Sequence, residues 1–258
     1  MILEYKGIPI YYTDNGSGKC IVLLHGFLEN SNIWNNMEAK LSINNRVVCI
    51  DLLGHGKTGC LGYIHTMELM AKVVETVLNY LKINESIFIG HSMGGYVALA
   101  FAEKNLKAIS GLCLMNSTAL ADGKEKQRNR DRAIQAVKQN HKTFIRLAII
   151  NLFLPKNRTI HSENIKQLIN EALKTPLQGI LAALEGMKIR KNRESLLRNT
   201  PFKKMMVIGK KDPALNYESL VSQVKNTDVD VVEFPDGHMS FIENERELFQ
   251  TIMHFIDF

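Results

Sequence analysis

The feature that most constrains the fold is a serine between two glycines, directly after a short apolar run. The apolar run covers residues 87–89, and Gly90, Ser92 and Gly94 follow it at alternate positions. A serine on a sharp strand-to-helix turn adopts strained backbone angles, and only small neighbours fit around that turn. We therefore expect a side chain at position 90 or 94 to collide across the turn, and Ser92 to stand exposed above a sheet. Ser92 is the first candidate nucleophile.

The backbone around this turn also offers a site for a negatively charged oxygen. Met93 follows Ser92 and would place its amide at a helix N-terminus, where N–H groups favour an anion. In such an oxyanion hole the second donor comes from the loop after an early central strand. That loop contains His25, Gly26 and Phe27, so we predict the amide of Phe27 as the second donor. We expect His25 to fix the loop by hydrogen bonding and not to act as a second base.

Short β-rich runs alternate with helical patterns over most of the chain. This alternation is typical of an α/β fold with a mainly parallel sheet and helices on both faces, preceded here by an antiparallel hairpin. The predicted strands are residues 2–6, 10–13, 20–24, 47–50, 86–89, 109–115, 204–208 and 229–234. The predicted helices of this part are residues 34–41, 67–81, 96–101, 214–225 and 241–256.

The alternation stops between residues 117 and 200, where the pattern is helical throughout. The helices expected there lie near residues 124–140, 143–153, 162–173 and 177–190. We therefore predict two units. An α/β core is formed by residues 1–116 and 201–258, and an all-helical cap is formed by residues 117–200.

Positive charge is concentrated in this predicted cap. Residues 117–200 contain 17 Lys and Arg against 7 Asp and Glu, whereas the rest of the chain contains 15 against 19. Solvated faces of amphipathic helices are the favoured explanation, and a functional basic surface is the alternative. No nucleic-acid-binding motif and no interleaving of aromatic with basic residues accompanies the charge, so nucleic acid is not an expected partner.

Two residues near the C-terminus complete a possible constellation around Ser92. A serine hydroxyl becomes a good nucleophile when an imidazole accepts its proton and a carboxylate orients the imidazole. Asp212 follows the strand predicted at residues 204–208, and His238 follows the last predicted strand. Catalytic groups of open α/β folds collect at this edge of the sheet, and the chain order serine, acid, histidine is the one that the serine turn predicts. These features together favour a catalytic triad over isolated turn-forming roles.

Three other acidic residues compete for the role of Asp212. Asp228 and Asp230 flank the start of the last predicted strand, far from the edge where Ser92 is expected. Asp236 precedes Gly237 and His238, and we expect it to shape the turn that presents the histidine. Asp212 therefore remains the predicted acid.

Large or polar residues near Ser92 are candidates for substrate binding. His91 and Tyr96 flank the serine turn, and Trp34 lies a short way beyond the loop of Phe27. Core packing is the default role of such aromatic residues, and lining of a pocket is the alternative. We predict His91, Tyr96 and Trp34 as pocket residues.

Two further patterns carry no predicted chemistry. Residues 51–58 are rich in glycine and contain a lysine, but they lack the spacing of a phosphate-binding loop, so we predict a structural turn. The histidines show no shared ligand spacing. We therefore expect neither a metal nor a cofactor.

Cysteine usage and the N-terminal sequence indicate the compartment. Cys20, Cys49, Cys60 and Cys113 are scattered, which favours buried reduced thiols over disulfides or a metal site. No basic segment followed by an apolar one opens the chain, and no apolar run is long enough to cross a membrane. We expect a cytoplasmic protein that acts on a small molecule and not at a membrane.

The motifs together resemble those of the α/β-hydrolase superfamily, in its branch of serine hydrolases with a helical cap. The matching motifs are His25-Gly26-Phe27 for the oxyanion loop, residues 51–56 for an Asp-x-x-Gly-x-Gly turn, residues 90–95 for the nucleophile elbow, Asp212 for the acid and Gly237-His238 for the base. The resemblance implies the α/β-hydrolase fold and a carboxylesterase-like activity, in which a small or medium carboxylic ester is cleaved through an acyl-enzyme.

Two other functions occur on this scaffold, a pyruvate-eliminating lyase of menaquinone biosynthesis and a ligand-binding signalling protein. The lyase has a similar pattern at residues 25–28 and at Trp34. It carries Tyr before the nucleophile and Arg after the second elbow glycine, where this chain has His91 and Tyr96. Basic cap residues would then contact an anionic substrate instead, and the candidates are Arg128, Arg132 and Arg146.

Overall fold

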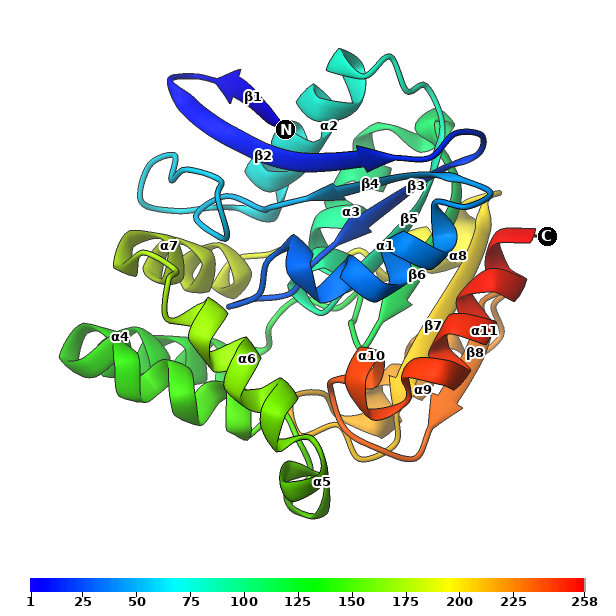
Figure 1. The fold of residues 1–258 in the computed structure, drawn as a ribbon. Coiled ribbons are helices and arrows are strands. Elements are labelled where there is room, and N and C mark those ends of the chain that lie inside the picture. The colour runs from blue at the N-terminus through cyan, green and yellow to red at the C-terminus, as the bar shows by residue number, and fades with distance from the viewer. Residues whose placement is uncertain (258) are drawn as a thin grey trace.

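The computed structural model describes residues 1–257. Within them, eight strands form one sheet in the order β1-β2-β4-β3-β5-β6-β7-β8 (Figure 1). Strand β2 is antiparallel to β1 and β4, and the other pairings are parallel, which confirms the predicted hairpin and mainly parallel sheet. The strands are β1 (Ile2–Tyr5), β2 (Ile8–Asn15), β3 (Cys20–Leu24), β4 (Arg46–Ile50), β5 (Ser86–His91), β6 (Ile109–Met115), β7 (Lys203–Gly209) and β8 (Asp230–Phe234).

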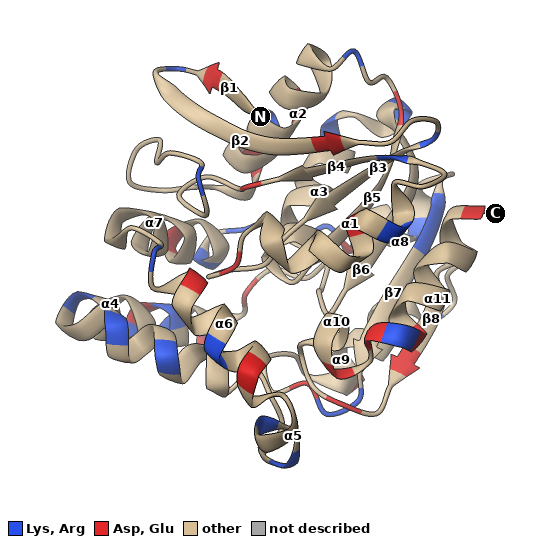
Figure 2. Ribbon diagram, viewed as in Figure 1, with Lys and Arg blue, Asp and Glu red and all other residues tan. Residues whose placement is uncertain are grey.

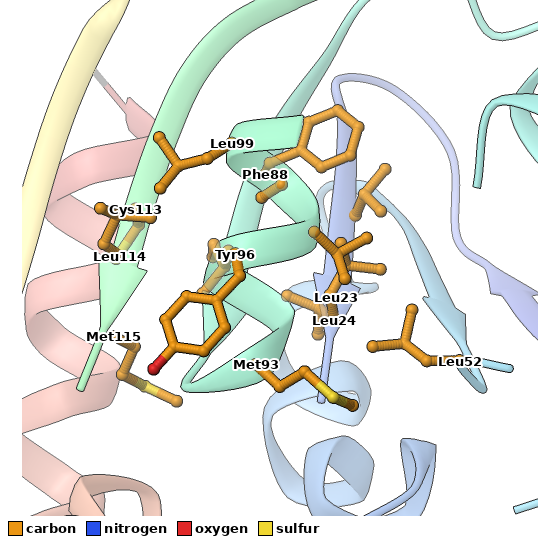
Figure 3. Packing of buried hydrophobic residues seen from close by; sticks show 14 of the residues in the cluster. Leu23, Leu24, Leu52, Phe88, Met93, Tyr96, Leu99, Cys113, Leu114 and Met115 are labelled. Carbon is orange, nitrogen blue, oxygen red and sulfur yellow. The ribbon is translucent and has the colours of Figure 1, made fainter. Parts of the chain in front are cut away.

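The central strands are largely apolar, as expected where both faces of a sheet are covered. Every residue of β3 and β5 is buried. Leu23 and Leu24 of β3 and Phe88 of β5 pack beside helix α3 (Met93–Lys104), as Figure 3 shows. The ring of Phe88 lies 4.6 Å from that of Phe101 in α3, measured between centroids. Strand β5 and helix α3 are thus held firmly on both sides of the turn that carries Ser92.

Helices cover both faces of the sheet. Helices α2 (Met67–Tyr80) and α3 pack together on one face, and α1 (Asn35–Leu41) and α11 (Glu245–Asp257) lie on the other (Figure 1). Helix α2 begins where expected, because the hydroxyl of Thr66 accepts a hydrogen bond from the amide of Leu69 at 3.0 Å. The remaining short elements of this part are η1 (Ser31–Trp34), η2 (Leu106–Ala108), α9 (Tyr217–Val224) and α10 (Ser240–Glu243).

Between β6 and β7 the chain is helical, as predicted for residues 117–200. The helices of this segment are α4 (Lys124–Ile150), α5 (Pro155–Ile160), α6 (Ser162–Ala172), α7 (Leu177–Lys188) and α8 (Glu194–Asn199). Helix α4 packs against both α6 and α7, at the lower left of Figure 1. Helix α8 packs instead against α3 and α9. The last helix of the segment therefore belongs spatially with the sheet.

The structure differs from the predicted helices at several places, and helix α8 is one that was not predicted. Helix α4 spans the two helices predicted near 124–140 and 143–153, and the boundary between them survives as a break at Asn140 (φ −156°, ψ 87°). The Asn140 side chain accepts a hydrogen bond from the Thr143 amide at 3.0 Å and so caps the second part. Helix α5 starts at Pro155, in the stretch between the helices predicted near 143–153 and 162–173, where no helix was predicted. The predicted final helix is divided at Asn244 into α10 and α11.

Two further observations concern membrane-spanning helices and the cysteine thiols. In the part of the chain that the structure describes, no helix combines the length and the apolar character needed to cross a bilayer. The thiols of Cys20, Cys49 and Cys113 are buried in strands β3, β4 and β6, and Cys60 is half-buried; all four are free.

Candidate active site

The turn between β5 and α3 has the strained geometry predicted for Ser92. Ser92 has φ +48° and ψ −112°, a left-handed conformation that is costly for a residue with a side chain. Two hydrogen bonds hold it there. Its amide donates to the carbonyl of Met115 at 3.0 Å, and its carbonyl accepts from the Ser117 hydroxyl at 2.7 Å. Strand β6 and the residue two positions after it therefore fix the turn from the side.

The flanking glycines are required by close approach of the backbone. A Cβ atom at Gly90 would lie 2.5 Å from backbone atoms of Gly94 and Gly95. A Cβ atom at Gly94 would overlap the carbonyl oxygen of Leu24 at the end of β3. The predicted collision across the turn is thus present at Gly90, whereas a side chain at Gly94 would collide with the end of β3.

Asp212 and His238 are brought together from two neighbouring strand ends. Nδ1 of His238 lies 2.7 Å from Oδ2 of Asp212, and both side chains are almost fully buried. The other carboxylate oxygen of Asp212 accepts hydrogen bonds from the amides of Ala214 (2.8 Å) and Leu215 (3.0 Å). Burial by itself raises the pKa of Asp212, but His238 and these donors outweigh burial and lower it. Asp212 is therefore held as a carboxylate that orients the imidazole.

Asn116 connects the acid loop to the base loop, a role that sequence reasoning missed. It lies directly after β6, with φ +44°, and its amide donates to the carbonyl of Val207. Its side-chain nitrogen lies 3.3 Å from Oδ2 of Asp212 and 3.2 Å from the carbonyl of Gly237. One carboxamide thus positions both loops.

Glu243 holds the loop of His238 in place, a role that was not identified from the sequence. Its Oε2 accepts from the amides of Gly237 (3.1 Å) and Met239 (3.2 Å), on either side of the histidine. Its Oε1 accepts from Asn157 at 2.7 Å. The contacts with Gly237 and Met239 are local, whereas the contact with Asn157 joins residues 86 positions apart, which no local sequence pattern indicates.

A cavity of about 310 Å³ lies between the serine turn and the helical segment. Its size is at the lower end for a small-molecule site. The residues around it are Phe27, Glu29, His91, Ser92, Tyr96, Ala214, Leu215 and His238 from the sheet-bearing part, and Lys126, Asn129, Arg130, Ala133, Phe144, Ala148, Leu152, Leu184 and Met187 from α4, α7 and the connection after α4. The described residues include no hydrogen bond between the Ser92 hydroxyl and His238, and such contacts are often long without substrate.

Of the two predicted oxyanion donors, Phe27 lines this cavity and Met93 is the neighbour of the lining residue Ser92. Met93 occupies the first position of α3. The loop of Phe27 is fixed by two side chains. The amide of Gly26 donates to Oε2 of Glu29 at 2.6 Å, and Nε2 of His25 accepts from the amide of Leu52 at 2.9 Å. His25 therefore has the bracing contact that was predicted for it.

His91 and Tyr96 line the cavity, but His91 is tied to the protein on both ring nitrogens. Its Nδ1 lies 2.9 Å from Oε2 of Glu29, and its Nε2 lies 3.1 Å from the backbone carbonyl of His238. Burial alone would lower the pKa of His91, but the Glu29 carboxylate outweighs burial, so the pKa is raised. Both nitrogens then donate, so His91 connects Glu29, which holds the Gly26 amide, to the backbone of His238.

Trp34 was predicted to line the pocket, but the structure places it away from the cavity at Ser92. Its side chain is fully buried, does not line the cavity at Ser92, and lies 6.2 Å from the ring of Phe241. The position in the sequence near the Phe27 loop was misleading, because η1 turns the indole into the core between the sheet and α10.

The other acidic residues considered from the sequence have structural contacts. Asp228 pairs with Lys204 at 3.0 Å at the start of β8, and Asp236 accepts from Asn157 and Asn244. Asp51 accepts from the amides of Ser31 (2.7 Å) and Lys57 (2.8 Å), as a structural turn requires. Across residues 1–257, no group of three or more His, Cys, Asp or Glu side chains is arranged to hold a metal ion.

A second, larger cavity of about 740 Å³ lies between α1, α6 and α11. Glu29 lines both cavities, whereas Ser92 and His238 line the smaller one alone. The candidate active site is therefore the smaller cavity, where the reactive side chains converge.

Comparison with known proteins agrees with this geometry. The sequence profile of the alpha/beta hydrolase fold matches residues 19–245, which is most of the chain. The chain belongs to the alpha/beta hydrolase fold family. The resemblance to the α/β-hydrolase superfamily inferred from the motifs is confirmed. Among solved alpha/beta hydrolases, a thermophilic esterase from Thermogutta terrifontis with malate bound has a TM-score of 0.91 and 28% identity, covering 99% of this chain and 96% of that one.

Curated relatives match over shorter stretches. An uncharacterized protein of Mycobacterium tuberculosis is 35% identical over 102 residues, and a 2-hydroxy-6-oxononadienedioate/2-hydroxy-6-oxononatrienedioate hydrolase of Paraburkholderia phymatum is 35% identical over 116 residues. These alignments cover 40% and 42% of this chain, and 30% and 40% of the relatives' lengths. They support membership of the alpha/beta hydrolase family and leave the substrate to be argued from the site.

Proposed function

We propose that the protein is a serine hydrolase that cleaves a small or medium carboxylic ester, or a related acyl bond, through Ser92, His238 and Asp212. The observation that carries the proposal is the 2.7 Å contact between Nδ1 of His238 and Oδ2 of Asp212 at the cavity that Ser92 lines. This contact assigns the proton of the imidazole to Nδ1 and leaves Nε2 available as a base.

The first half of the reaction forms an acyl-enzyme. Ser92 Oγ attacks the carbonyl carbon while Nε2 of His238 takes the hydroxyl proton, and Asp212 stabilises the imidazolium. The backbone amides of Phe27 and Met93 donate hydrogen bonds to the oxyanion of the tetrahedral intermediate. His238 then gives its proton to the departing alcohol, and the acyl group remains on Ser92.

The second half returns the serine. His238 removes a proton from a water molecule, whose oxygen attacks the acyl carbon. The same two amides bind the second oxyanion, and collapse of this intermediate gives the carboxylic acid and the Ser92 hydroxyl, which regains its proton from His238.

In this proposal the helical segment between β6 and β7 acts as a cap. Helices α4 and α7 supply one wall of the cavity, and the serine turn and the Phe27 loop supply the other. Residues of the cap then choose among substrates, because the reacting groups belong to the other wall. The Thermogutta terrifontis protein is an esterase, and its 28% identity over nearly the whole chain supports the reaction type.

The test is labelling by a fluorophosphonate probe together with turnover of 4-nitrophenyl esters of graded chain length. We expect labelling of the wild-type protein and hydrolysis of acetate to octanoate esters, and loss of both in Ser92→Ala. Ser222→Ala is the matched control, because Ser222 is an exposed serine of α9 far from the cavity lining. An unlabelled wild-type protein without ester turnover would refute the proposal and favour the lyase or the ligand-binding alternative.

A further inference from the structure

Two cationic side chains enter the wall of the cavity opposite the serine turn. Lys126 and Arg130 are four residues apart in α4, so they project from the same face of the helix, and both line the cavity that Ser92 and His238 line. The stripe of Lys and Arg along α4 is visible in Figure 2. Most of that stripe is solvated, whereas these two residues face the site.

Arg130 is held in place by a carboxylate that it shares. Nε of Arg130 lies 3.0 Å from Oδ2 of Asp122, whose side chain is fully buried. The other oxygen of Asp122 lies 2.7 Å from Nη1 of Arg190. One negative charge therefore serves two guanidinium groups, and the pair of arginines keeps an excess of one positive charge.

Arg190 cannot supply that excess charge to a ligand. It is buried, its Nε donates to the carbonyl of Leu120 at 3.1 Å, and its guanidinium lies 4.1 Å from the ring centre of Tyr96. By contrast, the hydrogen bond of Arg130 to Asp122 uses Nε, and the side chain is 24% exposed. The terminal nitrogens of Arg130 remain for a ligand in the cavity.

No carboxylate of residues 1–257 forms an ion pair with Lys126, although Asp122 and Asp212 act on it at longer range. Within the same residues Lys126 makes no hydrogen bond either. Lys126 as a whole residue is exposed, but its ammonium group is partly shielded from water, and this burial lowers its pKa. The Asp122 carboxylate opposes the shift, whereas the positive charges of Arg190 and Arg130 lower the pKa further. An anion placed beside Lys126 would compensate both for the lost hydration of its ammonium and for the repulsion from Arg130 and Arg190.

The rest of the lining offers no compensating charge. Glu29 is the acidic residue among the described lining residues, and its carboxylate already binds the Gly26 amide and His91. The cavity therefore combines a nucleophile with Lys126, which forms no ion pair within residues 1–257, and with Arg130, which shares the Asp122 carboxylate with Arg190.

We infer that Lys126 and Arg130 form a carboxylate-binding subsite, and that the preferred substrate is an ester carrying a second, ionised carboxylate. This inference rests on the proposed serine hydrolase function. Arg130 can offer its two terminal nitrogens to the two carboxylate oxygens, and Lys126 adds a point charge. The subsite belongs to the cap wall, so it binds the end of the substrate that does not react.

The test compares charged with neutral esters of the same skeleton. One arm uses mono-4-nitrophenyl esters of succinate, glutarate and adipate against their methyl 4-nitrophenyl diesters, which places the charge on the acyl side. The other uses 4-acetoxybenzoate against its methyl ester, which places the charge on the alcohol side. We expect the wild-type protein to prefer the charged member in at least one arm, with a preference that weakens as salt is added.

Lys126→Met should lower the ratio of kcat/KM for charged over neutral ester about tenfold, the usual size of a charge-assisted hydrogen bond. Lys138→Met is the matched control, because Lys138 is an exposed lysine of the same helix outside the cavity lining, and its ratio should equal that of the wild type. Arg130→Met should act in the same direction. Equal ratios in wild type and Lys126→Met would overturn the inference.

A binding measurement separates this inference from the proposed reaction. Calorimetry with succinate, glutarate and adipate should detect binding by the wild-type protein, and Lys126→Met should weaken it about tenfold while Lys138→Met does not. If the probe does not label Ser92 but Lys126→Met still weakens binding, the hydrolase proposal fails and the subsite stands. If labelling succeeds but no diacid binds and no ester pair shows a charge preference, the subsite fails alone.

Discussion

Nδ1 of His91 lies 2.9 Å from Oε2 of Glu29, in an ion pair whose side chains are 1% and 5% exposed. Glu29 also binds the amide of Gly26 beside the oxyanion loop, and His91 also binds the backbone carbonyl of His238. The pair therefore joins the two loops that the proposed reaction needs at a fixed distance. Neither side chain has a role in the chemical steps, so both are positioning residues.

Glu29→Gln should destabilise the protein in a pH-dependent way. The pKa of His91 is raised above its ordinary 6.5, so its contribution to folding is complete below about pH 6.5 and is lost as pH rises through the raised value. The pKa of Glu29 is lowered below its ordinary 4.5, so its contribution is present above about pH 4.5 and is lost as pH falls through the lowered value. The pair stabilises most between these limits.

The expected loss for Glu29→Gln near pH 5.5 is about 3 kcal/mol, the usual cost of removing one partner from a buried pair. Above the raised pKa of His91 the loss should shrink, because the imidazole is then neutral in both the folded and the unfolded protein. Urea unfolding at a series of pH values measures this difference. A loss that is constant from pH 5.5 to pH 9 would contradict a charged His91.

Asp212→Asn should lower kcat for ester hydrolysis by about 10⁴-fold with little change in KM, because the amide favours the wrong tautomer of His238. Asp230→Asn is the matched control, since Asp230 is an exposed acid at the start of β8 and was one of the alternatives in the sequence. Steady-state kinetics with one 4-nitrophenyl ester measures both variants. Comparable losses in the two would rule out Asp212 as the specific partner of His238.

Gly94→Ala should destabilise the fold and abolish labelling of Ser92, because the new methyl group would overlap the carbonyl oxygen of Leu24. Strand β3 and the turn would have to separate, at a cost of about 1–3 kcal/mol. Gly123→Ala is the control, since a Cβ at Gly123 meets no atom within 4 Å of the described chain. Thermal unfolding and probe labelling measure the two effects, and a Gly94→Ala protein as stable and as reactive as the control would contradict the turn geometry.

Trp34→Phe should affect stability and leave KM for short esters unchanged, because the indole packs in the core and not in the cavity. The smaller ring leaves a void that costs about 1–3 kcal/mol. Since Trp34 is the single tryptophan of the chain, its fluorescence should also shift to longer wavelength when the wild-type protein unfolds. A raised KM with unchanged stability would restore Trp34 as a pocket residue.

Local sequence patterns predicted the parts of the site that depend on short-range geometry. The turn at Ser92 is defined by glycines two residues away on each side, and the ends of β7 and β8 present Asp212 and His238 because parallel strands end at a common edge. In such cases a few adjacent residues determine the backbone path, so the sequence alone was sufficient.

The supporting contacts could not be predicted, because they join distant segments. Glu29 and His91 are 62 residues apart, and Asn116 reaches a carbonyl 121 residues away. The identity of the basic residues that face the cavity also depends on contacts between distant segments. The sequence suggested Arg128, Arg132 and Arg146, which are exposed and do not line the cavity. Lys126 and Arg130 line it instead, because tertiary packing decides which face of α4 turns inward.

The most direct test of the central claim is rapid-quench mass spectrometry during turnover of 4-nitrophenyl butyrate, followed by digestion and mapping of the acylated peptide. The account predicts a butyryl group on Ser92 that appears before steady state in the wild-type protein and does not form in His238→Gln, which lacks the base for acylation. Acylation of another residue, or turnover without any acylated Ser92, would contradict it.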